Sequence, residues 1–114
     1  MEFTLYEYAA DLTYVVDGDT VDMVVDLGFH TKVKDRFRLL GINTPERGKP
    51  GYTEAKAFVQ GVMATTPQVK IRTHLDAMDK YGRMLADIYY PVDGVYASLN
   101  QALLDAGLAV VYLP

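Results

Sequence analysis

The chain has 114 residues, 50% of them apolar and 23% charged, which excludes a disordered tail, a collagen-like repeat and a membrane span. Its length predicts one domain, residues 1–114, that is large enough to bury a core. The absence of Cys excludes disulfides and thiolate metal sites, and the two histidines, His30 and His74, are too few and too far apart to indicate a zinc site.

Charge is segregated along the chain. The formal net charge is −4, yet all 11 Lys and Arg residues lie between Lys32 and Arg83. That stretch holds five acids and carries +6, whereas the remainder holds ten acids, no Lys or Arg, and carries −10. The pattern fits either a local anion-binding face on an acidic body or charges that never gather on one surface.

The N-terminal segment does not resemble a signal peptide. Residues 1–12 have acids where a basic region belongs, and they contain no long apolar run. We therefore expect either a cytoplasmic chain or a secreted one whose signal has been removed.

Strands dominate the first third of the chain. Segments 12–16 and 20–26 are rich in Val, Thr and Tyr, and they flank Asp17–Gly18, a dipeptide suited to a tight hairpin turn. Apolar and basic side chains then alternate through residues 29–39. This alternation predicts a third strand whose apolar face includes Phe29.

A helix and two further strands follow a loop rich in Gly and Pro. Apolar side chains at helical spacing across residues 55–63 predict an amphipathic helix, with Thr53 as its cap. Alternation across residues 69–75 and 84–90 predicts the fourth and fifth strands, with a polar turn between them.

A second helix is predicted near the C-terminus. Ser98 and Gln101 form a capping box, and Gly107 suits a C-terminal cap. We expect the apolar residues 108–113 to pack against the body. The order of three strands, a helix, two strands and a helix predicts a mainly β, α+β fold: a five-stranded OB-type Greek-key barrel with two packed helices.

Three segments together hold the residue types that phosphodiester cleavage requires: Asp17-Gly18-Asp19-Thr20, the stretch from Arg38 to Glu46, and Asp79-Lys80-Tyr81-Gly82-Arg83. Asp19 and Asn43 supply hard oxygen ligands suited to Ca²⁺. Arg38 and Arg83 can each clamp phosphate oxygens with two hydrogen bonds. Glu46 is a loop carboxylate able to direct a water. Such a reaction needs a cation, fixed donors for the developing charge and an acceptor that orients the nucleophile.

Structural interpretations compete with these roles. We interpret Asp17 as a turn residue and Asp19 as a ligand. Arg38 fits either a solvated charge on the basic face of its strand or a site residue, and Arg83 fits either a salt bridge to Asp79 or a site residue. Their positions beside loops favour the site for both arginines.

The aromatic and basic residues outside the three segments are interpreted as structural or surface residues. We expect Tyr14, Tyr89 and Tyr90 to be core or rim aromatics rather than stacking platforms. Arg36 and Arg72 are expected to be surface residues that aid substrate capture.

In this order, the three segments resemble a staphylococcal-type thermonuclease (micrococcal nuclease) domain. The resemblance runs from about Tyr14 to Val111 and includes the EAKAF helix and the closing LNQALLDAGLAVV. It implies an OB-type barrel, dependence on Ca²⁺, and cleavage of both DNA and RNA to 3′-phosphate products.

The resemblance also implies roles for single residues. Asp19 would ligate Ca²⁺ beside the backbone carbonyl of Thr44. Arg38 and Arg83 would bind the scissile phosphate. Glu46 would act through water, as general base or as the group that positions the water.

Two further positions match substrate contacts, and one departs from the family pattern. Lys80 would contact a terminal phosphate, and Tyr81 would stack near a nucleotide. Asn43 stands where the family's best-known member has a second metal-binding aspartate, so we expect weaker Ca²⁺ binding. The loop 46–54 is also shorter than in that member.

We therefore expect a monomeric, Ca²⁺-dependent, sugar-nonspecific endonuclease that prefers single-stranded DNA or RNA and has no membrane partner. One alternative is an OB-fold module that binds nucleic acid with weak or no turnover, which Asn43 favours. Another is a structural or partner-binding domain, which the acidic total suggests. A glycosidase that uses Asp17 and Asp19 is disfavoured, because two residues in a tight turn give little control over carboxylate spacing.

Overall fold

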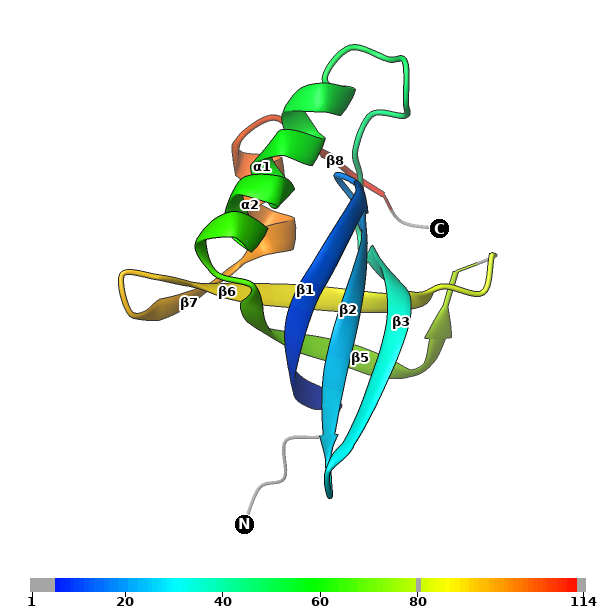
Figure 1. Cartoon of the computed structure of the whole chain (residues 1–114). Coiled ribbons are helices and arrows are strands. Elements are labelled where there is room, and N and C mark those ends of the chain that lie inside the picture. The colour runs from blue at the N-terminus through cyan, green and yellow to red at the C-terminus, as the bar shows by residue number, and fades with distance from the viewer. Residues whose placement is uncertain (1–5, 80, 113–114) are drawn as a thin grey trace.

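Five strands of the chain close into a barrel. The structure is a computed structural model that describes residues 6–79 and 81–112, with no side chains described at 75–77. The barrel strands are β1 (Glu7–Asp17), β2 (Thr20–Gly28), β3 (Thr31–Leu39), β5 (Gln68–Met78) and β6 (Met84–Val92). Antiparallel pairs join β3 to β2, β2 to β1, β1 to β5 and β5 to β6, and a parallel pairing of β6 with β3 closes the barrel (Figure 1).

Smaller elements cover one end and one edge of this barrel. They are β4 (Ile42–Asn43), α1 (Tyr52–Thr65), β7 (Val95–Ser98), α2 (Leu99–Asp105) and β8 (Val110–Val111). The helix α1 packs on β1 and α2 packs on β6, so that both helices lie at the same end of the barrel (Figure 1). The predicted fold class, a mainly β OB-type barrel with two helices, is confirmed. The sequence patterns did not predict β4, β7 and β8.

The barrel interior is filled by alternate strand residues. Met23, Leu39, Ile71 and Ile88 are fully buried, as is Leu103 from α2. This inward alternation turns the intervening side chains of each strand outward. Burial of the apolar face explains why these segments form strands with this register.

The first hairpin turn is one residue later than predicted. Asp17 pairs with Thr20, so the turn residues are Gly18–Asp19 rather than Asp17–Gly18. A Cβ on the glycine of this turn would lie 2.8 Å from the Cβ of Ala55 and 3.0 Å from Cγ2 of Thr44. Only glycine fits, and the close approach holds Asp19 beneath the start of α1.

The prediction that Phe29 lies on an apolar strand face is wrong. Phe29 is 99% exposed. Together with His30 it forms the turn between β2 and β3, with left-handed φ angles of 54° and 61°. The hairpin extends beyond the barrel core, so the outer half of β3 has no layer to pack against.

The two helix starts differ from each other. The predicted Thr53 cap is wrong, because α1 begins at Tyr52 and its N-cap is Gly51, with a left-handed φ of 90°. The Ser98 cap is confirmed: its hydroxyl accepts a hydrogen bond of 3.1 Å from the backbone N–H of Gln101. Side-chain capping therefore fixes α2, whereas backbone conformation fixes the start of α1.

The C-terminal segment packs only in part. Leu108 and Ala109 lie against the core, but the side chains of Val110 and Val111 are exposed. Here β8 is held by backbone pairing with β4 instead. Leu113 lies outside the described residues.

Neither α1 nor α2, the helices in the part of the chain that the structure describes, has the length and hydrophobicity needed to cross a membrane.

Candidate functional site

Asp19 is the centre of a buried polar cluster at the end of the barrel beneath α1. Its Oδ2 accepts a hydrogen bond of 3.0 Å from the backbone N–H of Thr44 and lies 3.4 Å from Nη2 of Arg38. Its Oδ1 accepts a hydrogen bond of 3.1 Å from the hydroxyl of Thr20. The cross-strand pairing of Thr20 with Arg38 brings these groups together. The carboxylate is thus held by its neighbour Thr20 and by two other segments of the chain, β3 and the loop at Thr44.

Arg38 is not a solvated charge, because its side chain is only 11% exposed. Its Nη1 donates to the carbonyl oxygens of Leu39 at 3.2 Å and Ile42 at 2.9 Å. Its Nη2 donates to Oδ1 of Asn43. The loop that follows β3 therefore holds the guanidinium in a fixed orientation.

Arg83 reaches the same cluster from the far side. Its Nη1 donates to the hydroxyl of Thr20 at 3.3 Å, and its Nε donates to Oδ2 of Asp79 at 2.6 Å. The Thr20 hydroxyl thus joins Asp19 to Arg83. The salt bridge of Arg83 to Asp79 is confirmed, and it directs the guanidinium toward Thr20. The site role of Arg83 stays a prediction.

The loop that presents Arg83 is tied together by Asp79. The backbone N–H groups of Tyr81 and Arg83 donate to its Oδ1 at 2.9 and 2.8 Å. Burial raises the pKa of Asp79, but the hydrogen bonds from Arg83 and Tyr81 outweigh burial and lower it overall. The carboxylate therefore stays charged and keeps the loop in its turn.

Tyr81 lies at the open side of this loop. It is 72% exposed, and its ring centroid lies 5.3 Å from the guanidinium carbon of Arg83. Its place beside Arg83 suits a group that contacts substrate. Lys80, the other predicted substrate contact, lies outside the described residues.

Glu46 is exposed and lies two residues beyond Thr44. Its backbone carbonyl accepts a hydrogen bond of 2.9 Å from the N–H of Lys49, which shapes the loop. Across residues 6–79 and 81–112, its carboxylate has no hydrogen-bond or ion-pair partner. The structure thus brings Asp19, Arg38 and Arg83 into one network, whereas Glu46 lies outside that network in the exposed loop after Thr44.

Sequence reasoning missed Thr20 and Tyr52. Thr20 belongs to the first of the three segments, but no role was predicted for it, although its position next to Asp19 could have indicated one. The Tyr52 hydroxyl, at the start of α1, donates to Oδ1 of Asp17 at 2.7 Å. This bond ties the first turn to the helix and agrees with the interpretation of Asp17 as a structural residue.

The oxygen atoms around Asp19 are of the chemical type that a hard cation prefers as ligands. Oδ2 of Asp19 and Oδ1 of Asn43 both contact Nη2 of Arg38, so the two oxygens lie close together around that guanidinium nitrogen. The hydroxyl of Thr44 is buried nearby and has no hydrogen-bond partner in the described part of the chain. Oxygen donors of this kind suit Ca²⁺. No group of three or more His, Asp or Glu able to hold a metal occurs among the residues described.

Comparison with known proteins identifies relatives. A family model described as "Staphylococcal nuclease homologue" matches residues 36–113, well over half of the chain. That range includes Arg38, Glu46 and Arg83, whereas Asp19 precedes it.

Three curated relatives have similar levels of identity. The chain is 33% identical over 106 residues to "Endonuclease YncB" of Bacillus subtilis strain 168, covering 88% of this chain and 46% of the relative. It is 32% identical over 102 residues to an "Uncharacterized endonuclease" of Escherichia coli O157:H7, covering 86% and 57%. It is 32% identical over 80 residues to "Thermonuclease" of Staphylococcus intermedius, covering 66% and 45%. The chain spans about half the length of these relatives. By its match to the family model, the chain belongs to the staphylococcal nuclease family.

Proposed function

We propose that the chain is a nuclease that hydrolyses phosphodiester bonds of DNA and RNA with the help of Ca²⁺, preferring single strands and acting as a monomer. The observation that carries the proposal is the meeting of Arg38 and Arg83 at the Asp19–Thr20 turn. Membership of the family, and relatives whose names include endonuclease and thermonuclease, support the same reaction.

The two arginines bind the scissile phosphate and stabilise its growing negative charge. A guanidinium has five N–H donors. Within the described part of the chain, the hydrogen bonds of Arg83 use Nε and Nη1, which leaves Nη2 for a phosphate oxygen. Fixed donors of this kind stabilise a transition state without reorganising during the reaction.

Asp19 and Asn43 would hold Ca²⁺ through their side-chain oxygens, and Thr44 through its backbone carbonyl. When bound, Ca²⁺ polarises the phosphoryl group and neutralises part of its charge. The Thr44 N–H and the Thr20 hydroxyl keep the carboxylate of Asp19 oriented for this role.

Glu46 acts on the nucleophile. Its free carboxylate orients a water and accepts its proton as the water oxygen bonds to phosphorus. The P–O5′ bond breaks in line with the attack, and the departing 5′-oxygen takes a proton from solvent water, so that the products are a 3′-phosphate and a 5′-hydroxyl. Tyr81 and Lys80 hold the neighbouring nucleotide and phosphate.

One observation favours the second candidate, a module that binds nucleic acid with little or no turnover. Asn43 replaces a carboxylate with an amide, and that amide accepts a hydrogen bond from Arg38. This module would bind single-stranded DNA in millimolar Ca²⁺ without cleaving it.

The test uses fluorogenic single-stranded DNA with Ca²⁺ and then with a chelator, for the wild-type chain and Glu46→Gln. We expect the chelator to abolish cleavage and Glu46→Gln to lower kcat by about 10²–10⁴-fold, the usual range for a positioned proton acceptor. The control is Glu54→Gln in the first turn of α1, which should cleave like the wild type. Chelator-resistant cleavage, or full activity in Glu46→Gln, would refute the mechanism.

A further inference from the structure

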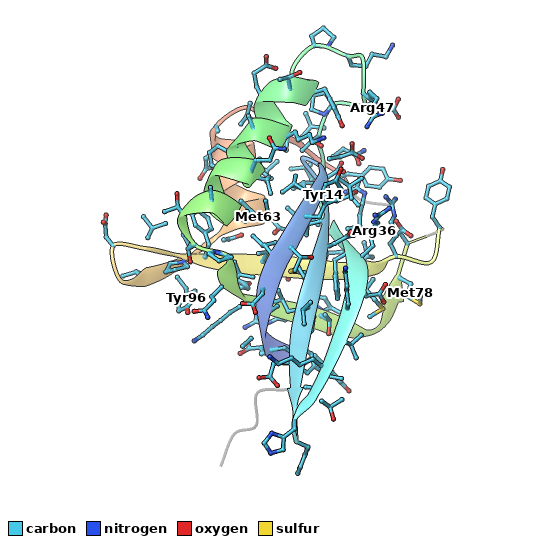
Figure 2. The ribbon with its side chains drawn as sticks, viewed as in Figure 1. Tyr14, Arg36, Arg47, Met63, Met78 and Tyr96 are labelled. Atoms are coloured by element: carbon cyan, nitrogen blue, oxygen red, sulfur yellow. The ribbon has the colours of Figure 1, made fainter. Side chains whose placement is uncertain are left out.

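A groove lies on the outer face of the sheet, away from the Asp19 cluster. Its volume is about 360 Å³, and its lining comes from β1, β5, β6 and β7. Ile71 and Ile88 point into the barrel and are buried, so Lys70, Arg72 and Tyr89 point outward. In Figure 2, Tyr96 of β7 lies on the opposite side of the ribbon from Arg36 and Met78.

Aromatic rings and cations alternate in this groove. Nζ of Lys70 lies 4.4 Å from the ring centroid of Tyr96, and the guanidinium carbon of Arg72 lies 5.8 Å from that of Tyr89. Lys70 and Tyr89 are also direct cross-strand partners. Four side chains from three strands thus form one surface of flat rings bordered by positive charge.

The charge of the groove favours an anion at one end. Arg72 faces two acids, Glu7, which pairs with it, and its cross-strand partner Asp87. Lys70 lines the same groove and has no ion pair with a carboxylate among the described residues, so it is the cation left for an anion. A second hollow shares Lys70 and Tyr96 with the first but also has Asp11 and Asp26 in its lining. An anionic ligand therefore fits over Tyr89 and Tyr96 rather than farther across the sheet.

We infer that this groove binds a second stretch of the single-stranded nucleic acid on which the proposed nuclease acts, so the inference rests on the proposed function. Stacking on aromatic rings holds bases of any sequence, and a planar guanidinium adds to it. The flexible side chain of Lys70 can leave the ring of Tyr96 to pair with a phosphate. An acidic peptide would use the cations but not the ring faces.

The position of the groove predicts a dependence on substrate length. Tyr89 is six residues beyond Arg83, which at 3.3–3.4 Å per strand residue is about 20 Å. Leu85, Asp87 and Tyr89 share the outward face of β6, because Ala86 and Ile88 are buried. A dinucleotide bound at Arg83 cannot reach the groove, whereas a longer strand can.

The binding test is fluorescence anisotropy with a labelled 15-nucleotide oligothymidylate in the presence of a chelator, which stops metal-dependent cleavage. We expect Tyr96→Ala to weaken binding about tenfold, in line with the loss of one stacked base. Tyr96→Phe keeps the ring and should bind like the wild type. Lys34→Ala, which removes an exposed positive charge of β3 outside the groove, is the matched control. Tyr96 is 46% exposed, so thermal melting should show that these variants are folded.

A kinetic test uses two substrate lengths. Tyr96→Ala should raise KM about tenfold for the 15-nucleotide substrate, leave kcat unchanged, and leave cleavage of a dinucleotide substrate unchanged. Ring-dependent binding without any cleavage would uphold the groove and refute the proposed nuclease. Normal binding by Tyr96→Ala, or displacement of the oligonucleotide from the groove by polyglutamate at lower concentration than by unlabelled oligothymidylate, would overturn the inference whether or not the chain cleaves DNA.

Discussion

Two arginine–aspartate pairs join β3 to the hairpin of β1 and β2, and they differ in an instructive way. The Arg36–Asp22 pair is short, 2.7 Å from Nε to Oδ1, but its arginine side chain is 51% exposed. The Arg38–Asp19 pair is longer, 3.4 Å, yet its arginine is only 11% exposed and also binds two carbonyls and an amide. Water competes for the first pair and hardly reaches the second. Burial and shared partners, rather than distance, therefore rank these contacts.

The largest loss of stability and activity that this comparison predicts follows from replacing Arg38. Arg38→Ala leaves the buried carboxylate of Asp19 without its ion-pair partner and two carbonyl oxygens without the Arg38 donor, so we expect the free energy of unfolding to fall by about 3 kcal/mol. Loss of a fixed phosphate donor should also lower kcat by about 10²–10³-fold. Urea denaturation and cleavage of single-stranded DNA measure the two effects.

Arg36→Ala is the matched control for that prediction. It removes the same side chain from the same strand, two residues away, and we expect little change in stability or kcat. Equal losses in both variants would mean that burial does not distinguish the pairs. Arg38→Lys adds a further test, because it keeps the charge but cannot reproduce the planar fork, so we expect activity to stay low.

Two glycines sharpen the comparison at the turn that presents Asp19. A Cβ at Gly18 would meet Ala55 at 2.8 Å, whereas nothing lies within 4 Å of one at Gly61 in α1. Gly18→Ala should lower the free energy of unfolding by about 1–3 kcal/mol through overpacking, and it should lower kcat because Asp19 moves. Gly61→Ala should raise the free energy of unfolding by about 0.5–1 kcal/mol, since alanine favours a helix. Urea denaturation of both variants tests this, and a stabilised Gly18→Ala would contradict the tight turn.

A substitution at Asn43 changes the charge next to the buried Arg38–Asp19 pair and leaves both residues of the pair in place. Asn43→Asp adds a second carboxylate close to that of Asp19, and we expect Ca²⁺ to bind about tenfold more tightly, since affinity follows ligand charge. Isothermal titration calorimetry measures this. Gln60→Glu, on the exposed side of α1, controls for added charge alone. Unchanged or weaker affinity would exclude Asn43 as a ligand.

Local patterns predicted the elements that close the barrel. Alternation in residues 20–26 and 69–75, and helical spacing in 55–63, correspond to β2, β5 and α1. Such patterns record which face is buried, and burial is what selects these elements. They cannot record where the barrel ends, so Phe29 continues the alternation in sequence and yet projects into solvent.

The residues of the candidate site were predictable from the three motifs, but the contacts between them were not. Three segments predicted that Arg38 and Arg83 would meet, and in the structure both contact the Asp19–Thr20 turn. The burial of Arg38 depends on the loop after β3, whose carbonyls face its guanidinium. The bridging role of Thr20 depends on the parallel pairing of β3 with β6. Both arise from tertiary arrangement that no local pattern contains.

The smallest expected effect concerns pH, and it tests whether the exposed pair acts through charge. The hydrogen bond from Arg36 lowers the pKa of Asp22, and burial offsets only part of that shift. A carboxyl whose pKa is lower in the folded chain than in the unfolded chain, where it is about 3.9, stabilises the fold at pH values above that unfolded-state pKa. This contribution is lost as the pH falls through the folded-state pKa. The small difference in unfolding free energy between the wild-type chain and Arg36→Ala should therefore be constant from about pH 7 to pH 5 and shrink below about pH 4. Urea denaturation across this range measures it. A difference that does not shrink as the pH falls would mean that Arg36 stabilises the hairpin by packing its aliphatic stem rather than by its charge.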